Sequence, residues 1–248
     1  MKVVTIFIML FISSASQAAY KLKESEYGWR LYYDSRADVY LQLVDLRKAT
    51  LRMACTQYTF DCSHKELNDH WDAISRKPYS ITNGQFFRRR SGDTQLTLPV
   101  ASYGGNFIAN GLRQYDPVYE GYIRTLQIKE SSAMVLSYYY PFLLSSSYNG
   151  GIVGLAPFED GTSNGRTMIG LYNNYTLIIL SAEKMKEIDA VNILFSLNIS
   201  ERNIVILDGS GSSQLKTEST EFYGCVDLPG ICFKDKRTFP QYMLVESK

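Results

Sequence analysis

The sequence lacks a charge excess of either sign and has no internal repeat or low-complexity tract. Lys and Arg number 26 against 25 Asp and Glu, which leaves a net charge of +1 over 248 residues. Proteins that mainly bind the phosphate backbone of nucleic acids carry a clear basic excess, so this balance argues against a nucleic-acid partner. The same balance argues against a polybasic membrane anchor.

Histidine is also scarce. The two histidines, His64 and His70, are not spaced as metal ligands on one helix face, which stand four residues apart. The sequence therefore indicates no cofactor, although acidic side chains near Asp208 leave a divalent cation open.

The N-terminus carries the one long apolar stretch, and residues 1–19 have the features of a secretory signal peptide. A single basic residue precedes the apolar stretch, and the small and polar residues SSASQAA follow it. The stretch is shorter than the roughly 20 residues of a membrane span. We expect cleavage after Ala18 or Ala19, which gives an exported protein, secreted or periplasmic, without stable membrane insertion and with a mature chain of 20–248. A retained N-terminal anchor is the alternative.

Export predicts that the four cysteines form disulfides, because exported proteins meet oxidising conditions. The cysteines lie in two close pairs that are far apart in the sequence. We favour the bonds Cys55–Cys62 and Cys225–Cys232, each closing a surface loop, although four cysteines allow three connectivities. The spacing inside each pair is wider than in most structural zinc sites.

Hydrophobic patterning predicts one domain of the α+β class, with a large mixed or antiparallel twisted sheet and a few packing helices. The segment at 39–45, VYLQLVD, alternates as a strand does, and 50–55 is its expected partner. A hairpin is expected over 167–180, around the turn Asn173-Asn174. Helical spacing follows over 181–198, and the short apolar run at 203–207 predicts a buried strand.

An acidic residue and a glycine-serine segment follow that last strand. Asp208 is followed by GSGSS, and glycines let backbone N–H groups approach a ligand closely. Successive N–H groups, helped by serine hydroxyls, bind anions. The segment predicts an anion-binding loop made of Gly209, Gly211, Ser212 and Ser213. An ordinary turn has a similar composition, so a loop without function remains the alternative.

Three segments in order resemble the phosphodiester glycosidase family. They are ITNGQFF at 81–87, GRTMIGL at 165–171 and ILDGSGSSQL at 206–215. With the strand at 39–45 and the segment RTFP at 237–240, the resemblance covers most of 39–245. The chain departs from the family pattern where Ser210 and Gln85 replace glycines.

The resemblance implies a hydrolase that cleaves the glycosidic C–O bond of a sugar-1-phosphodiester in a phosphorylated glycan or sugar phosphate. Asp208 is then the catalytic carboxylate, as a nucleophile, a base for water or an electrostatic partner of the oxocarbenium-like sugar. Arg166 would bind the phosphate with its planar fork. Asn83 and Gly84 would orient the sugar or the phosphate.

Several alternatives stay open. The chain could be a non-catalytic exported protein that binds a glycan or a protein on the same fold, or a phosphodiesterase that breaks the P–O bond. Arg166 could form a buried ion pair with Asp208 that only holds two loops together. Glu159 and Asp160, just before Arg166, could supply a second carboxylate.

Overall fold

A computed structural model describes residues 20–55, 65–90, 93–96, 98, 100–101, 108–109, 121–137, 150–158, 160–228, 231–234 and 236–248. The expected signal peptide and Cys62 lie outside these residues. Within them, no helix is both long and apolar enough to cross a membrane.

The larger of two main sheets is antiparallel throughout its described pairs. Its strands run in the order β1-β2-β3-β14-β13-β15-β12-β10-β11, with β8 beside β12 and β9 beside β8. Their bounds are Lys21–Glu26 (β1), Trp29–Asp34 (β2), Val39–Asp45 (β3), Thr176–Lys186 (β14), Ser163–Asn173 (β13), Ile204–Ile206 (β15), Gly150–Leu155 (β12), Ile123–Lys129 (β10), Ser132–Leu136 (β11), Val100–Ala101 (β8) and Ile108–Ala109 (β9).

The smaller sheet has the order β17-β16-β5-β20-β4, and two separate hairpins accompany it. Its strands are Glu221–Tyr223 (β17), Gln214–Lys216 (β16), Ser80–Asn83 (β5), Gln241–Ser247 (β20) and Ala49–Cys55 (β4). The hairpins pair Cys225–Leu228 (β18) with Ile231–Lys234 (β19), and Phe87–Arg90 (β6) with Asp93–Leu96 (β7). The helices are Leu67–Asp72 (α1) and Glu187–Ser196 (α2), with short 3-10 turns at Glu201–Asn203 (η4) and Ser210–Ser212 (η5).

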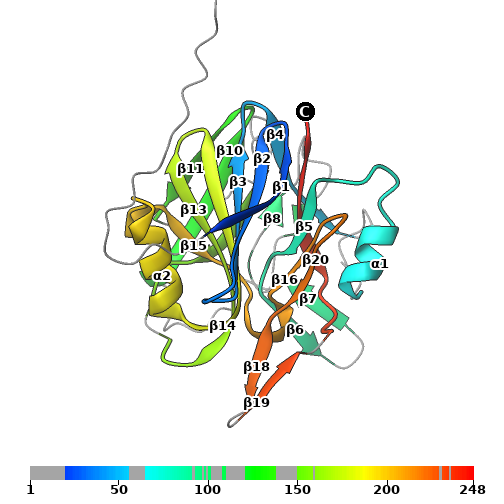
Figure 1. The fold of residues 1–248 in the computed structure, drawn as a ribbon, viewed down its shortest axis with the longest axis vertical. Coiled ribbons are helices and arrows are strands. Elements are labelled where there is room, and N and C mark those ends of the chain that lie inside the picture. The colour runs from blue at the N-terminus through cyan, green and yellow to red at the C-terminus, as the bar shows by residue number, and fades with distance from the viewer. Residues whose placement is uncertain are drawn as a thin grey trace, which may run out of the picture.

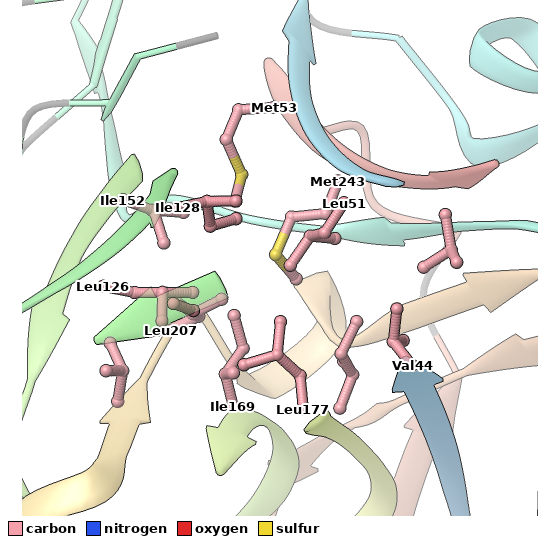
Figure 2. Close-up of a cluster of buried hydrophobic side chains, with 14 of the residues drawn as sticks. Val44, Leu51, Met53, Leu126, Ile128, Ile152, Ile169, Leu177, Leu207 and Met243 are labelled. Atoms are coloured by element: carbon pink, nitrogen blue, oxygen red, sulfur yellow. The ribbon is translucent and has the colours of Figure 1, made fainter. Parts of the chain in front are cut away.

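The two sheets share one apolar core. Side chains from both inner faces enter it, as Figure 2 shows for Val44, Leu51, Met53, Leu126, Ile128, Ile152, Ile169, Leu177, Leu207 and Met243. Each helix covers an outer face: α2 packs on the large sheet through Val191 and Leu194, and α1 packs on the small sheet through Leu67 and Trp71. Figure 1 shows these layers, with α2 and α1 on opposite sides.

The expected α+β class is wrong, because the described chain has two α-helices and twenty strands. The fold is dominated by antiparallel sheet. The helix expected over 181–198 begins only at Glu187, because β14 continues to Lys186. The run Leu177–Ala182 is buried continuously, as in a strand covered on both faces.

The expected partner of β3 is also wrong. The strand at 39–45 forms with the predicted bounds, but it pairs with β2 and β14, while β4 pairs with β20 in the other sheet. The expected hairpin at 167–180 is confirmed and is longer than predicted, since β13 and β14 pair from Ser163 to Lys186.

Candidate functional site

Asp208 lies just beyond β15, where the two sheets meet the turn η5. Its backbone N–H donates to the carbonyl of Gly84, 3.1 Å away, which ties it to the end of β5. Asp208 keeps partial contact with solvent. The strand and turn predicted around Asp208 are therefore present, and they place the carboxyl group at the edge of the core.

The environment of Asp208 makes its carboxyl group titratable near neutrality. Burial raises the pKa of Asp208 to about 7, against a hydrogen bond from Ser212, the positive charge of Arg237 and the N–H of Gly209, all of which lower it. A carboxyl group with such a pKa exchanges protons at neutral pH, as catalytic acids and bases do.

The side chain of Asn83 holds the Asp208 loop in place. Its Nδ2 donates to the carbonyl of Asp208 over 2.6 Å, and its Oδ1 accepts from Thr167 Oγ1 at 2.8 Å and from the N–H of Gln214 at 3.0 Å. The side chain is buried, with 1% exposure. These bonds join segments from all three sequence motifs, and Asn83 is placed to position Asp208 through its backbone.

Glycines allow two of these segments to touch. A Cβ on Gly209 would stand 2.6 Å from the carbonyl oxygen of Gly165, and a Cβ on Gly165 would stand 2.1 Å from that of Ser210. Both distances are too short for any side chain. The glycines of the second and third motifs therefore bring β13 and the Asp208 loop into direct backbone contact.

The serines of the loop have different surroundings. Ser212, buried, bonds to the Asp208 carboxylate, whereas Ser213 donates its hydroxyl to the carbonyl of Arg166 at 2.8 Å. The N–H groups of Ser212 and Ser213 donate to the carbonyls of Gly209 and Ser210, at 3.1 and 3.2 Å. Ser212 therefore contacts the carboxylate directly, whereas Ser213 connects the loop to β13.

The guanidinium of Arg166 makes its bonds on the other side of β13. Its Nη1 lies 2.8 Å from Asp160 Oδ2, its Nε donates to Met185 O at 3.0 Å, and Nη2 donates to the carbonyl of Thr162. Burial raises the pKa of Asp160, but bonds from Thr162 and Arg166 outweigh it, and the pKa lies below the ordinary value. None of these bonds reaches Asp208, so the ion pair considered between Arg166 and Asp208 is replaced by one with Asp160.

Arg237 is the cation beside Asp208. Its Nε and Cζ lie 3.2 and 3.4 Å from the position that a Cβ on Gly211 would take, so the guanidinium rests on a residue without a side chain. Gln214 holds both segments, because its Nε2 donates to the carbonyl of Gly211 at 3.0 Å and to that of Arg237 at 2.7 Å. Gly211 thus makes room for a positive charge at the carboxyl site.

Three of these residues were missed from the sequence: Thr167, Gln214 and Arg237. The alternation of side chains along a strand offered a signal for the first, because neighbours in β13 face opposite ways and only one of Arg166 and Thr167 can turn toward Asp208. Gln214 and Arg237 lie within segments that matched the family, but no local pattern shows that they meet.

The cysteine prediction is confirmed for one pair. Cys225 and Cys232 form a disulfide that closes the β18–β19 hairpin. The other predicted bond includes Cys62, outside the described residues. Glu183 Oε1 lies 3.8 and 3.5 Å from the two bonded sulfurs. Among the described residues this is the only group of three possible metal ligands, and its sulfurs are already bonded to each other.

Comparison with known proteins finds similarity in structure but not in sequence. No protein-family model and no curated protein matches the sequence of the chain. The catalytic domain of zebrafish N-acetylglucosamine-1-phosphodiester alpha-N-acetylglucosaminidase, auto-inhibited by its pro-peptide, matches with a TM-score of 0.60 and 13% identity, over 92% of this chain and 82% of that domain.

Two bacterial structures are also similar. A hypothetical protein from Synechocystis matches with a TM-score of 0.50 and 11% identity, over 92% of this chain and 61% of that one. A Burkholderia pseudomallei protein described as exported matches with a TM-score of 0.50 and 9% identity, over 88% of this chain and 74% of that one. At such identities the similarity concerns the fold, and it supports a fold like that of the zebrafish domain.

Proposed function

We propose that this chain is an exported hydrolase of the phosphodiester glycosidase family that cleaves the C–O bond between a sugar and its anomeric phosphate. The observation that supports it most is the Asp208 site: a carboxyl group with a pKa of about 7 beside the guanidinium of Arg237, on a glycine-serine turn. The similar fold of the zebrafish phosphodiester glycosidase domain supports the same reaction class.

The reaction needs a base and a place for negative charge. Water attacks C1 of the sugar and gives its proton to the Asp208 carboxylate, while the C1–O bond breaks and its electron pair stays on the phosphate oxygen. The products are a free sugar and a phosphate monoester. Because this leaving group carries its charge well, a strong general acid is less necessary than in ordinary glycoside hydrolysis. The proposed reaction uses no metal ion or organic cofactor.

Arg237 and the loop backbone would hold the phosphate. Arginine binds two phosphate oxygens at once. Within η5, the N–H groups of Ser212 and Ser213 donate to backbone carbonyls, so the N–H groups of Ser210 and Gly211, which precede them, would bind the phosphate. We assign the phosphate fork to Arg237, since the guanidinium of Arg166 is bonded to Asp160. Arg166 then positions the 160–162 segment against β13.

The proposed place of action is outside the cell or in the periplasm. The Cys225–Cys232 disulfide and the similarity to a bacterial protein described as exported support export, together with the signal-like residues 1–19. The proposed partner is a phosphorylated glycan or a sugar phosphate.

Hydrolysis assays on the purified oxidised protein test this proposal, with a panel of sugar-1-(methyl phosphate) diesters as substrates. Asp208→Asn should lower kcat/KM by about a thousandfold, and Arg237→Gln by about a hundredfold, because each removes a group that acts in the transition state. Asp189→Asn, an exposed carboxylate on α2, is the matched control and should leave kcat/KM unchanged. Treatment with EDTA should also leave it unchanged.

Arg166→Gln separates the two arginines. We expect it to lower the free energy of unfolding, because its side chain is buried in an ion pair. Its loss of kcat/KM should be smaller than that of Arg237→Gln. A loss of activity equal to that of Arg237→Gln, at unchanged stability, would show that Arg166 binds the phosphate. If no diester is hydrolysed while one of them still binds, the chain is a glycan-binding protein on this fold.

A further inference from the structure

The β18–β19 hairpin has two different faces. In an antiparallel pair, residues directly opposite each other share a face, and so do residues two apart along a strand. Val226 is opposite Phe233, and Ile231 lies two residues from Phe233, so these three side chains share one face. Cys225, Cys232 and Lys234 belong to the other.

The face with the disulfide rests on the large sheet. Lys234 Nζ lies 2.7 Å from Glu183 Oε2 at the end of β14, and the bonded sulfurs lie beside the same carboxylate. The ion pair attaches this face to β14, and the hairpin cannot turn its apolar side inward without breaking that ion pair. Figure 1 shows the hairpin projecting beyond both main sheets.

The opposite face is apolar, exposed and continuous with the Asp208 site. Val226 Cγ2 lies 3.0 Å from the position that a Cβ on Gly211 would take, on the same glycine that carries the Arg237 guanidinium. Farther along this face, Ile231 is 64% exposed and Phe233 55% exposed. An apolar strip therefore begins where the proposed phosphate site ends.

We propose that Ile231 and Phe233 form a subsite for an apolar leaving group, so that the substrate is a sugar-1-phosphate esterified to a long-chain alcohol. This inference rests on the proposed function and names the alcohol side of its substrate. With the phosphate on Arg237 and Gly211, one ester oxygen leads to the sugar at Asp208 and the other leads out along the hairpin. A long alkyl chain there would cover the two exposed side chains.

Binding of phosphate monoesters tests this without hydrolysis. Titration calorimetry on the full mature chain compares decyl phosphate, below its micelle concentration, with methyl phosphate. We expect decyl phosphate to bind at least about tenfold more tightly, because several CH₂ groups leave water. The double variant Ile231→Ser/Phe233→Ser should lose this preference and keep its affinity for methyl phosphate.

A matched double variant controls for general loss of surface hydrophobicity. Ile188→Ser/Phe195→Ser removes two other exposed apolar side chains, 44% and 40% exposed, from α2, and should leave both affinities unchanged. Equal affinity of the wild-type chain for both phosphates would overturn the subsite. So would binding to phosphatidylcholine vesicles that depends on Ile231 and Phe233 without any preference for decyl phosphate, because it would assign this face to a membrane surface.

Hydrolysis then separates this inference from the proposed function. With sugar-1-(decyl phosphate) and sugar-1-(methyl phosphate) as substrates, we expect the decyl diester to have the higher kcat/KM in the wild-type chain and in Ile188→Ser/Phe195→Ser. This difference should be absent in Ile231→Ser/Phe233→Ser. Equal kcat/KM values refute the subsite but leave the hydrolase intact. Hydrolysis of neither diester, with the preference for decyl phosphate retained, refutes the hydrolase and leaves an apolar phosphate-binding site.

Discussion

Asp208 combines partial burial with a nearby positive charge, and its titration should govern the pH dependence of activity. The carboxylate is the active form in the proposed reaction, so kcat/KM should rise with pH through an inflection at about 7. Arg237→Gln should move the inflection to higher pH, because the charge of Arg237 lowers this pKa. Rate profiles from about pH 5 to about pH 9 measure both effects. An inflection that stays in place would mean that Arg237 does not act on Asp208.

The same carboxyl group affects stability. Its pKa is raised in the folded chain, so as pH rises from the ordinary carboxylate range the unfolded chain loses this proton first. The free energy of unfolding of the wild-type chain therefore falls as the pH rises to about 7. A neutral amide at position 208 does not titrate and makes no such contribution. The stability that Asp208→Asn gains over wild type, measured by urea unfolding, should be larger at about pH 8 than at about pH 4. An equal gain at both values would contradict the raised pKa.

The backbone of Ser210 explains why the family that the sequence resembles has glycine at this position. Its φ is 58°, in the left-handed region that favours glycine, and the family has glycine at the matching position. Ser210→Gly should therefore raise the free energy of unfolding by about 1 kcal/mol. Ser200→Gly is the control, since Ser200 has a φ of −75° and should gain nothing. Urea midpoints compare the two, and a loss of stability in Ser210→Gly would show that its side chain contributes more than its backbone costs.

At the scale of elements, the β18–β19 hairpin connects the disulfide to the site, because Arg237 follows directly after it. The double variant Cys225→Ser/Cys232→Ser opens a short loop and should lower the free energy of unfolding by about 2 kcal/mol. It should also raise KM for a phosphodiester more than it lowers kcat, because Arg237 is less well held. Lys234→Gln, which removes only the ion pair with Glu183, is the control and should cost about 0.5 kcal/mol or less. An unchanged KM in the double variant would show that the disulfide does not help to position Arg237.

Local patterns predicted single elements well and their partners poorly. The strand at 39–45 and the hairpin of β13 with β14 follow from alternation and from the Asn173-Asn174 turn, which are properties of neighbouring residues. The pairing of β4 with β20 joins segments far apart in the sequence and depends on the packing of the whole sheet. The start of α2 was set too early, because a buried strand and a buried helix can carry the same apolar residues.

The site shows the same limit. The three motif segments do lie together, since Asn83 bonds to Asp208, Thr167 and Gln214. The sequence could not show which way the Arg166 side chain points, because that depends on the pleat of β13 within the sheet. Arg237, which follows the disulfide-closed hairpin, lies beside Gly211 although the two are far apart in the sequence, and no local pattern predicts that contact. The catalytic roles of all these residues stay predictions.

At the scale of the whole molecule, the shared core between the sheets predicts cooperative unfolding as one domain. The two tryptophans report on different layers, because Trp29 lies in the core between the sheets and Trp71, on α1, packs against the outer face of the small sheet. Variants that keep one tryptophan each, Trp71→Phe and Trp29→Phe, should show fluorescence changes that coincide with the circular dichroism transition in urea. A fluorescence transition that precedes the circular dichroism transition in either variant would indicate two separately unfolding units.

Removing a core side chain should weaken both layers together. Met243→Ala should lower the free energy of unfolding by about 3 kcal/mol as seen by either tryptophan, because Met243 from β20 packs against side chains of both sheets. Met134→Ala, at a position that is 52% exposed on β11, is the control and should cost less than about 1 kcal/mol. A loss seen by only one tryptophan would contradict a common core.

The proposed chemistry is tested most directly by the fate of the water oxygen. Hydrolysis of a sugar-1-phosphodiester in water labelled with the heavy oxygen isotope should place the label on C1 of the released sugar, because water attacks carbon while Asp208 takes its proton. Mass spectrometry of both products reads this out. A label on the phosphate would show P–O cleavage, and the absence of hydrolysis of any sugar-1-phosphodiester by the wild-type chain would contradict the hydrolase itself.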